Sequence, residues 1–169
     1  MRKLFACCAA LIFVAPSVRA QSKPVCSLLT ASDVSAIGAT GPGIPGEMPM
    51  TTGPTKGPTM KMCSWRMKAG GLHLGANPAP PGASRAAIES ELTKTYQMLT
   101  AQGWKQDKKD FGIVSCTMFT PPAGQKDAPT NTSCLAVVKG MMVSADTISM
   151  TPIPMEKLKA VVDSASARL

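Results

Sequence analysis

Aromatic side chains, histidine and acidic residues are all scarce in this chain of 169 residues. Aromatics make up 4%, histidine occurs once, and 10 acidic residues face 18 basic ones. Most of the basic residues are Lys, which lacks the planar fork that Arg offers to bases and phosphates, and few rings are present for base stacking. The composition therefore argues against a nucleic-acid-binding protein.

Long apolar runs and runs of charge are missing as well. No apolar stretch reaches the ~20 residues that a membrane span requires, so we expect no transmembrane segment in the mature chain. With 44% hydrophobic and 17% charged residues, the chain is neither a disordered acidic segment nor a coiled coil.

Signatures of catalysis are also missing from the sequence. No G-x-S-x-G motif marks a nucleophilic serine. The only histidine, His73, is expected on a strand face beside Arg66 and Lys68, and cations disfavour the imidazolium that a general base must form. Glu89 and Glu91 are two residues apart on an expected helix, so they point to different sides. The sequence therefore predicts that the protein is not an enzyme.

The N-terminus is typical of a secretory signal over residues 1–20. Arg2 and Lys3 precede an apolar stretch, Leu4–Ala15, and Val18-Arg19-Ala20 places small residues where a signal peptidase cleaves. Cleavage after Ala20 leaves one domain, residues 21–169, in the periplasm or secreted, and removes three cations, so the formal charge falls from +8 to +5. An alternative is lipidation at Cys7, because Leu4-Phe5-Ala6-Cys7 loosely matches a lipoprotein cleavage box.

Four cysteines remain after the signal: Cys26, Cys63, Cys116 and Cys134. An even number in an exported chain indicates two disulfides, and no C-x-x-C spacing points to zinc. Three pairings are possible. We favour Cys26–Cys63 and Cys116–Cys134, because each pair brackets a loop that would otherwise be costly to close.

Hydrophobic periodicity predicts alternating strands and helices. Residues 59–68 alternate with period two, which puts Cys63, Trp65 and Met67 on one face. A Gly70-Gly71 turn would lead into Leu72–Leu74, with Met67 opposite Leu74; a turn at Ala69-Gly70 would change the partners but not the faces. By contrast, residues 41–58 contain ten Gly or Pro in eighteen positions and are expected to form an irregular loop.

The remaining elements are expected at the following positions: helices at 26–38, 84–102 and a last one after Pro154; strands at 104–110, 113–120, 133–139 and 141–150. Within the first helix, Thr30-Ala31-Ser32-Asp33 resembles a capping box with Asp in place of Glu, and Ser84 is expected to cap the second helix. The second and last helices each have an apolar stripe that is expected to face inward: Ile88, Leu92, Tyr96 and Leu99 in the second, and Leu158, Val161, Val162, Ala165 and Leu169 in the last. Strands interleaved with helices in this way predict an α+β fold, an antiparallel β-sheet with helices packed on it.

Two cysteine-containing segments carry a resemblance to known proteins. Cys26-Ser-Leu-Leu-Thr, followed by a short helix ending in Gly and later by Cys63-Ser-Trp65, resembles small exported bacterial domains. These include a domain of unknown function in actinobacterial lipoproteins and the extracellular sensor domain of some mycobacterial receptor kinases. The resemblance implies a PsbP-like α/β sandwich with two disulfides, and this chain departs from it in having no kinase portion.

Methionine is the compositional outlier, with 12 residues in the chain. Thioethers are soft ligands that select Cu(I). Alternation places Met60, Met62 and His73 on one outer surface. We expect the loop that carries Met48 and Met50 to be able to fold over this surface, so these five residues form an alternative copper site. The other interpretation is that methionine replaces aromatics as an adaptable packing or contact residue.

The sequence thus predicts an exported, non-enzymatic module of the cell envelope without a resident cofactor, which binds a small ligand or an envelope protein. Its alternative is a methionine-rich periplasmic Cu(I)-binding protein.

Overall fold

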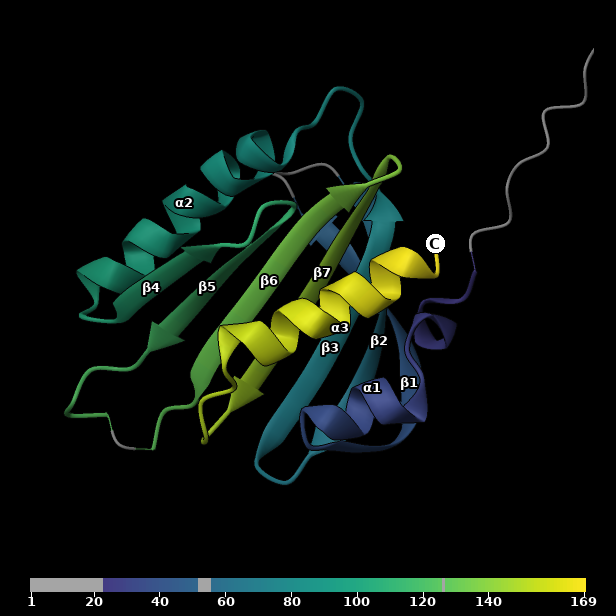
Figure 1. The fold of residues 1–169 in the computed structure, drawn as a ribbon. Coiled ribbons are helices and arrows are strands. Elements are labelled where there is room, and N and C mark those ends of the chain that lie inside the picture. The colour runs from purple at the N-terminus through teal and green to yellow at the C-terminus, as the bar shows by residue number, and fades with distance from the viewer. Residues whose placement is uncertain (1–22, 52–55, 126) are drawn as a thin grey trace, which may run out of the picture.

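The structure is a computed structural model that describes residues 23–51, 56–125 and 127–169. The predicted signal segment, with Cys7 and the cleavage point after Ala20, lies outside the described residues. The described strands form one seven-stranded antiparallel sheet in the order β1-β2-β3-β7-β6-β5-β4. Helices pack on this sheet, which confirms the predicted α+β class (Figure 1). Among the described helices, none has the length and apolar character needed to cross a membrane.

The elements follow the chain in this order: η1 (Val25–Leu28), α1 (Ala31–Ala36), β1 (Ala39–Thr51), β2 (Lys56–Met67), β3 (Gly70–Pro78), α2 (Arg85–Ala101), β4 (Lys105–Asp110), β5 (Val114–Thr120), β6 (Thr130–Val138), β7 (Met141–Ser149) and α3 (Met155–Ala167).

The two faces of the sheet differ in what covers them. On one, the α3 face, α3 crosses the strands while η1 and α1 lie near β1 and β2 (Figure 1). This face holds the core, which includes the fully buried Leu72, Leu74, Val143 and Leu158. The opposite α2 face is covered by α2 only over part of its width, because α2 lies toward the β4 side.

Both predicted disulfides are present. Cys26–Cys63 fastens η1 to β2 with a Cα–Cα distance of 5.1 Å. Cys116–Cys134 joins directly paired residues of β5 and β6, with Cα atoms 4.1 Å apart. Disulfides persist in oxidising compartments, so the two bonds fit an extracellular or periplasmic protein.

The irregular loop predicted for residues 41–58 is wrong for its described residues, whereas residues 52–55 lie outside the described part of the chain. Residues 39–51 form β1, which pairs with β2. Proline is tolerated because β1 is an edge strand, where a residue without an N–H need not break a ladder on both sides. The opposite edge, β4, carries Lys105, Lys108 and Lys109, and charged side chains also discourage pairing with another sheet.

The predicted first helix is divided in two. η1 ends at Leu28, and Thr30 begins α1 with a capping box, in which its hydroxyl accepts from the Asp33 amide at 3.2 Å and the Asp33 carboxylate accepts from the Thr30 amide at 2.8 Å. The predicted capping residues were right, but the break before Thr30 was not foreseen.

The predicted hairpin turn is displaced. Met67 pairs with Gly70 and Trp65 with Leu72, so Lys68 and Ala69 form the turn. The predicted faces are unchanged: Cys63 and Trp65 are buried on the α3 face. Gly70 has φ +146, and an added Cβ would lie 1.8 Å from the Ile148 carbonyl oxygen. The glycine is therefore required by the close approach of β7 and not by the turn.

The two ends of the described chain meet beside α3. The Lys23 ammonium donates to the Arg168 carbonyl at 2.7 Å. The Arg168 guanidinium in turn donates to the Leu28 carbonyl at 3.1 Å and forms an ion pair with Asp33 at 3.0 Å.

Candidate ligand-binding site

Helix α2 is anchored to the sheet by charges but packs on it incompletely. Ser84 caps the helix by accepting from the Ala87 amide at 3.2 Å. Arg85 forms an ion pair with Asp110 at 2.6 Å, and Glu89 forms another with Lys108 of β4 at 2.6 Å. The predicted apolar stripe faces the sheet, yet it is only half-buried along its length: Ile88, Leu92, Tyr96 and Leu99.

A groove of about 400 Å³ lies between that stripe and the sheet, and we call it the α2 groove. Its volume is within the range of small-molecule sites. The lining residues are Met60, Ile88, Leu92, Tyr96, Leu99, Phe119, Asn131, Ser133, Leu135, Met142, Ser144 and Asp146. Most of the wall is apolar. A ligand bound there would therefore bury apolar side chains that remain half-exposed in the fold.

The floor of the groove is polar, because the strands alternate. Val143 and Ala145 of β7 point into the α3-side core, so their neighbours Ser144 and Asp146 face the groove. Asp146 pairs in register with Ser133 of β6. Burial raises the pKa of the Asp146 carboxyl, while the hydrogen bond with Ser133 and the His73 charge act in the opposite direction.

Asp146 belongs to a polar row that crosses four strands. His73 of β3 is its partner on the other side, and His73 pairs in turn with Ser64 of β2. The Ser64 hydroxyl and His73 Nδ1 are 2.9 Å apart. Gly71 leaves room for the imidazole, since an added Cβ there would lie 3.3 Å from Nε2.

His73 lies on the outer face of the sheet, as predicted, but its neighbours include Asp146 as well as the expected cations. Its nearest carboxylate, Asp146, comes from a strand 73 positions later, and no local pattern indicates that β3 pairs with β7. Among the described residues, no ion pair joins His73 to Asp146.

Tyr96 lines the groove and is close to the carboxylates of Asp146 and Glu89. Its ring contacts Phe119 with centroids 4.8 Å apart and planes tilted by 52°. Burial raises the pKa of the Tyr96 hydroxyl, and the charges of Asp146 and Glu89 raise it further. The hydroxyl is therefore within the field of two carboxylates.

The predicted copper ligands, Met48, Met50, Met60, Met62 and His73, are spread over three strands. Met48 and Met60 are paired across β1 and β2, and Met62 follows on the same face. Met48 is 49% exposed, whereas Met60 and Met62 are half-buried. The side chain of Met50 is outside the description, and His73 Nδ1 is engaged by Ser64. Among the described residues, no cluster of three or more His, Cys, Asp or Glu could hold a metal ion.

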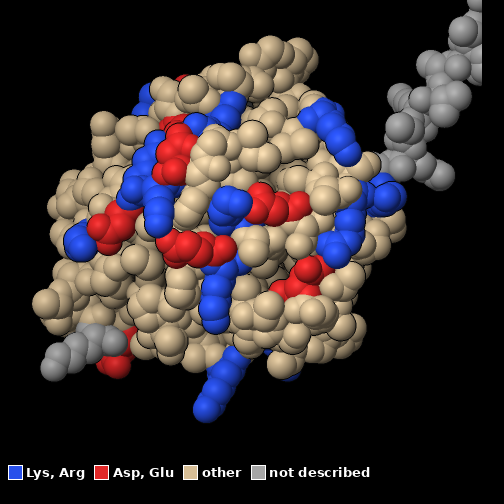
Figure 2. Space-filling view, in the orientation of Figure 1, with Lys and Arg blue, Asp and Glu red and all other residues tan. Residues whose placement is uncertain are grey.

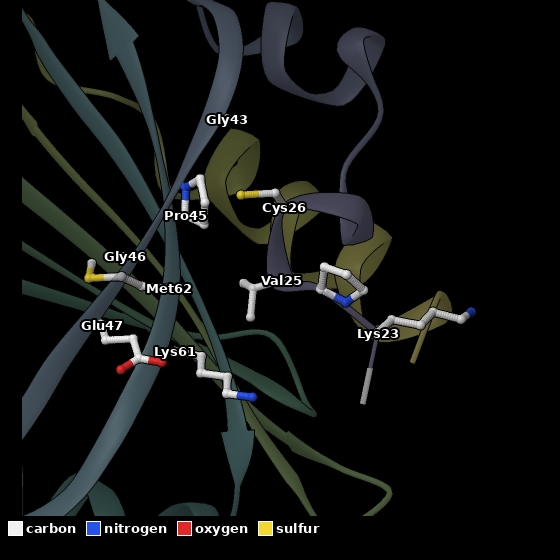
Figure 3. Close-up of a pocket in the computed structure, with 10 residues that line it drawn as sticks. Lys23, Val25, Cys26, Gly43, Pro45, Gly46, Glu47, Lys61 and Met62 are labelled. Atoms are coloured by element: carbon white, nitrogen blue, oxygen red, sulfur yellow. The ribbon is translucent and has the colours of Figure 1, made fainter. Parts of the chain in front are cut away.

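A second pocket, of about 530 Å³, lies between η1 and the β1–β2 edge. Figure 3 shows Val25 and Cys26 on one side of it and Gly43, Pro45 and Gly46 of β1 on the other. Glycine and proline supply much of the β1 wall, and Lys23, Glu47 and Lys61 add charged groups at the pocket. The α2 groove differs from it in having an aromatic wall above a polar floor.

Charged side chains on the α3 face are mixed in sign. Figure 2 shows basic and acidic residues interspersed over this face. Several are paired, for example Lys109 with Glu156 at 2.6 Å. Such a surface does not supply the continuous basic patch that a nucleic acid would contact.

Comparisons of the chain with protein-family models, with curated proteins and with solved structures found no match.

Proposed function

We propose that this is an exported, non-enzymatic binding protein of the cell envelope, and that it holds a small ligand in the α2 groove. Export follows from the N-terminal signal with cleavage after Ala20, which gives a periplasmic or secreted domain. The observation that supports binding is the groove itself: an apolar wall left half covered above a floor of convergent polar groups.

The methionines have a place in this proposal. Met60 and Met142 line the groove, where an unbranched and polarizable side chain adapts to the shape of a ligand. This supports the contact interpretation of the methionines, and Cu(I) binding is the alternative.

The test is binding of a neutral apolar fluorophore, N-phenyl-1-naphthylamine, to the purified mature protein. We expect its fluorescence to rise with the unaltered protein and with the variant Met98→Trp. Met98 is 62% exposed in α2 and does not line the groove. Leu92→Trp should abolish the rise, because the larger side chain fills the groove. Equal binding by both variants would place the probe elsewhere and contradict the proposed site.

Native mass spectrometry of protein purified from its export compartment tests the remaining parts. We expect a chain beginning at Gln21, with both disulfides closed and added mass from a retained small molecule. Reproducible hydrolytic or redox turnover by the same preparation would contradict the non-enzymatic part of the proposal.

A further inference from the structure

The charges that meet the α2 groove are opposite in sign to the charge of the protein. The chain has eight more basic than acidic residues. Of the described lining residues, however, none is Lys or Arg, and Asp146 supplies the one carboxylate. The groove is therefore an acidic site in a basic protein.

No basic side chain of the described residues forms an ion pair with Asp146. The nearest charged group on the sheet is His73 of β3, whose Nδ1 is engaged by Ser64, and Ser133 of β6 is its hydrogen-bond partner. From α2, Tyr96 faces Asp146, and Glu89, which also acts on Tyr96, is already paired with Arg85 and Lys108. Because a carboxylate in an apolar groove is stabilised chiefly by a counter-charge, Asp146 leaves room for a cation from a ligand.

The aromatic wall favours the same kind of ligand. The rings of Tyr96 and Phe119 are adjacent, and the faces of aromatic rings attract organic cations. Burial raises the pKa of the Asp146 carboxyl by more than the Ser133 hydrogen bond and the His73 charge lower it, so these two groups do not offset the burial of the carboxylate.

On the basis of the proposed function, we infer that the ligand of the α2 groove is a small organic cation: an amine or quaternary ammonium on an apolar alkyl or aryl body. The ammonium would lie against Asp146 and the Tyr96–Phe119 pair, and the apolar body along Leu92, Leu99 and Met142. Fatty acids and other apolar anions are disfavoured, because their carboxylate would lie against Asp146 and the described lining residues include no Lys or Arg to pair with it.

The test compares three probes with the same eight-carbon chain: octyltrimethylammonium, 1-octanol and octanoate. Each displaces N-phenyl-1-naphthylamine at a series of pH values from neutral to alkaline, because burial raises the pKa of the Asp146 carboxyl. We expect octyltrimethylammonium to bind at least tenfold more tightly than octanoate. Asp146→Asn should remove this preference and leave the affinity for 1-octanol within twofold. Asp163→Asn, on the opposite side of the domain in α3, is the matched control and should change neither.

The outcomes separate this inference from the proposed function. If the fluorophore and 1-octanol bind but the cation has no advantage, or if Asp146→Asn leaves the advantage in place, the cation inference is wrong and the groove remains a binding site. If neither the fluorophore nor any of the three probes binds, both the inference and the proposed site are wrong.

Discussion

Replacing Leu158 by Ala should cost the domain several times more stability than the same replacement at Leu92. Both leucines are inside helices and face the sheet, but Leu158 is 0% exposed in α3, whereas Leu92 is half-buried beside the α2 groove. Comparing the two variants therefore tests whether α2 packs tightly on the sheet, as α3 does, or leaves a groove beneath it.

The magnitudes follow from burial. Truncating a fully buried Leu to Ala loses about 2 kcal/mol of transfer free energy, and the cavity left behind brings the total for Leu158 to about 4 kcal/mol. At Leu92 about half of the transfer free energy is lost, and no new cavity forms because the groove is already open. We expect a loss of about 1 kcal/mol there.

Urea denaturation of both variants, followed by far-UV circular dichroism, measures the difference as free energies of unfolding. Equal losses at the two positions would mean that α2 packs as tightly as α3. In that case no groove exists in solution, and the reasoning behind the proposed site fails.

Three further predictions concern other parts of the molecule. Gly70→Ala should destabilise the domain by about 3 kcal/mol, because a Cβ would collide with the Ile148 carbonyl at a positive φ, whereas Gly124→Ala, where a Cβ meets nothing within 4 Å, should be neutral in the same denaturation experiment. For Asp33, burial alone would raise the pKa of the carboxyl, but the hydrogen bonds from Thr30 and Ser164 and the Arg168 charge outweigh it and hold the pKa below its ordinary value. A lowered pKa stabilises the fold above the unfolded-state pKa of about 4 and ceases to do so as pH falls through the folded value. The difference in Tm between the unaltered protein and Asp33→Asn should therefore be present at neutral pH and shrink in acid; a difference that is constant with pH would refute this. Finally, titration against a Cu(I) chelator should detect no tight binding, and tight binding that is lost when Met48, Met50, Met60 and Met62 are replaced together would restore the copper alternative.

Local signals predicted the helices and the faces of the strands well. The Thr30 capping box, the Ser84 cap and the inward stripe of α3 all depend on residues within one or two turns of each other, and the structure confirms them. The alternation around Cys63 and Trp65 was enough to assign the faces, because a period of two survives even when the turn is misplaced. The disulfide pairings were predicted for a similar reason: each joins segments that close a single loop or hairpin.

Features that depend on distant pairing could not be predicted. β1 reads as a loop because its Gly and Pro content is typical of turns, and only its position at the sheet edge makes it a tolerated strand. Gly70 was assigned to a turn, although the residue is needed where the β7 backbone passes close by. Asp146 was not singled out at all, since its role depends on the pairing of β3 with β7 and on α2 lying over the same face.

The position of the Cys26–Cys63 bond determines how the domain responds to a mechanical load. Force applied at Lys23 reaches Cys26 after three residues and then passes through the sulfur atoms to β2, so that the segment between the cysteines, with a sequence separation of 37, carries no tension. At ~3.5 Å per extended residue, this hides about 130 Å of contour length, and Cys116–Cys134, with a separation of 18, hides about 60 Å. A single molecule stretched between its adjacent ends would therefore lengthen in two distinct increments on reduction, the larger from the bond near its N-terminal end.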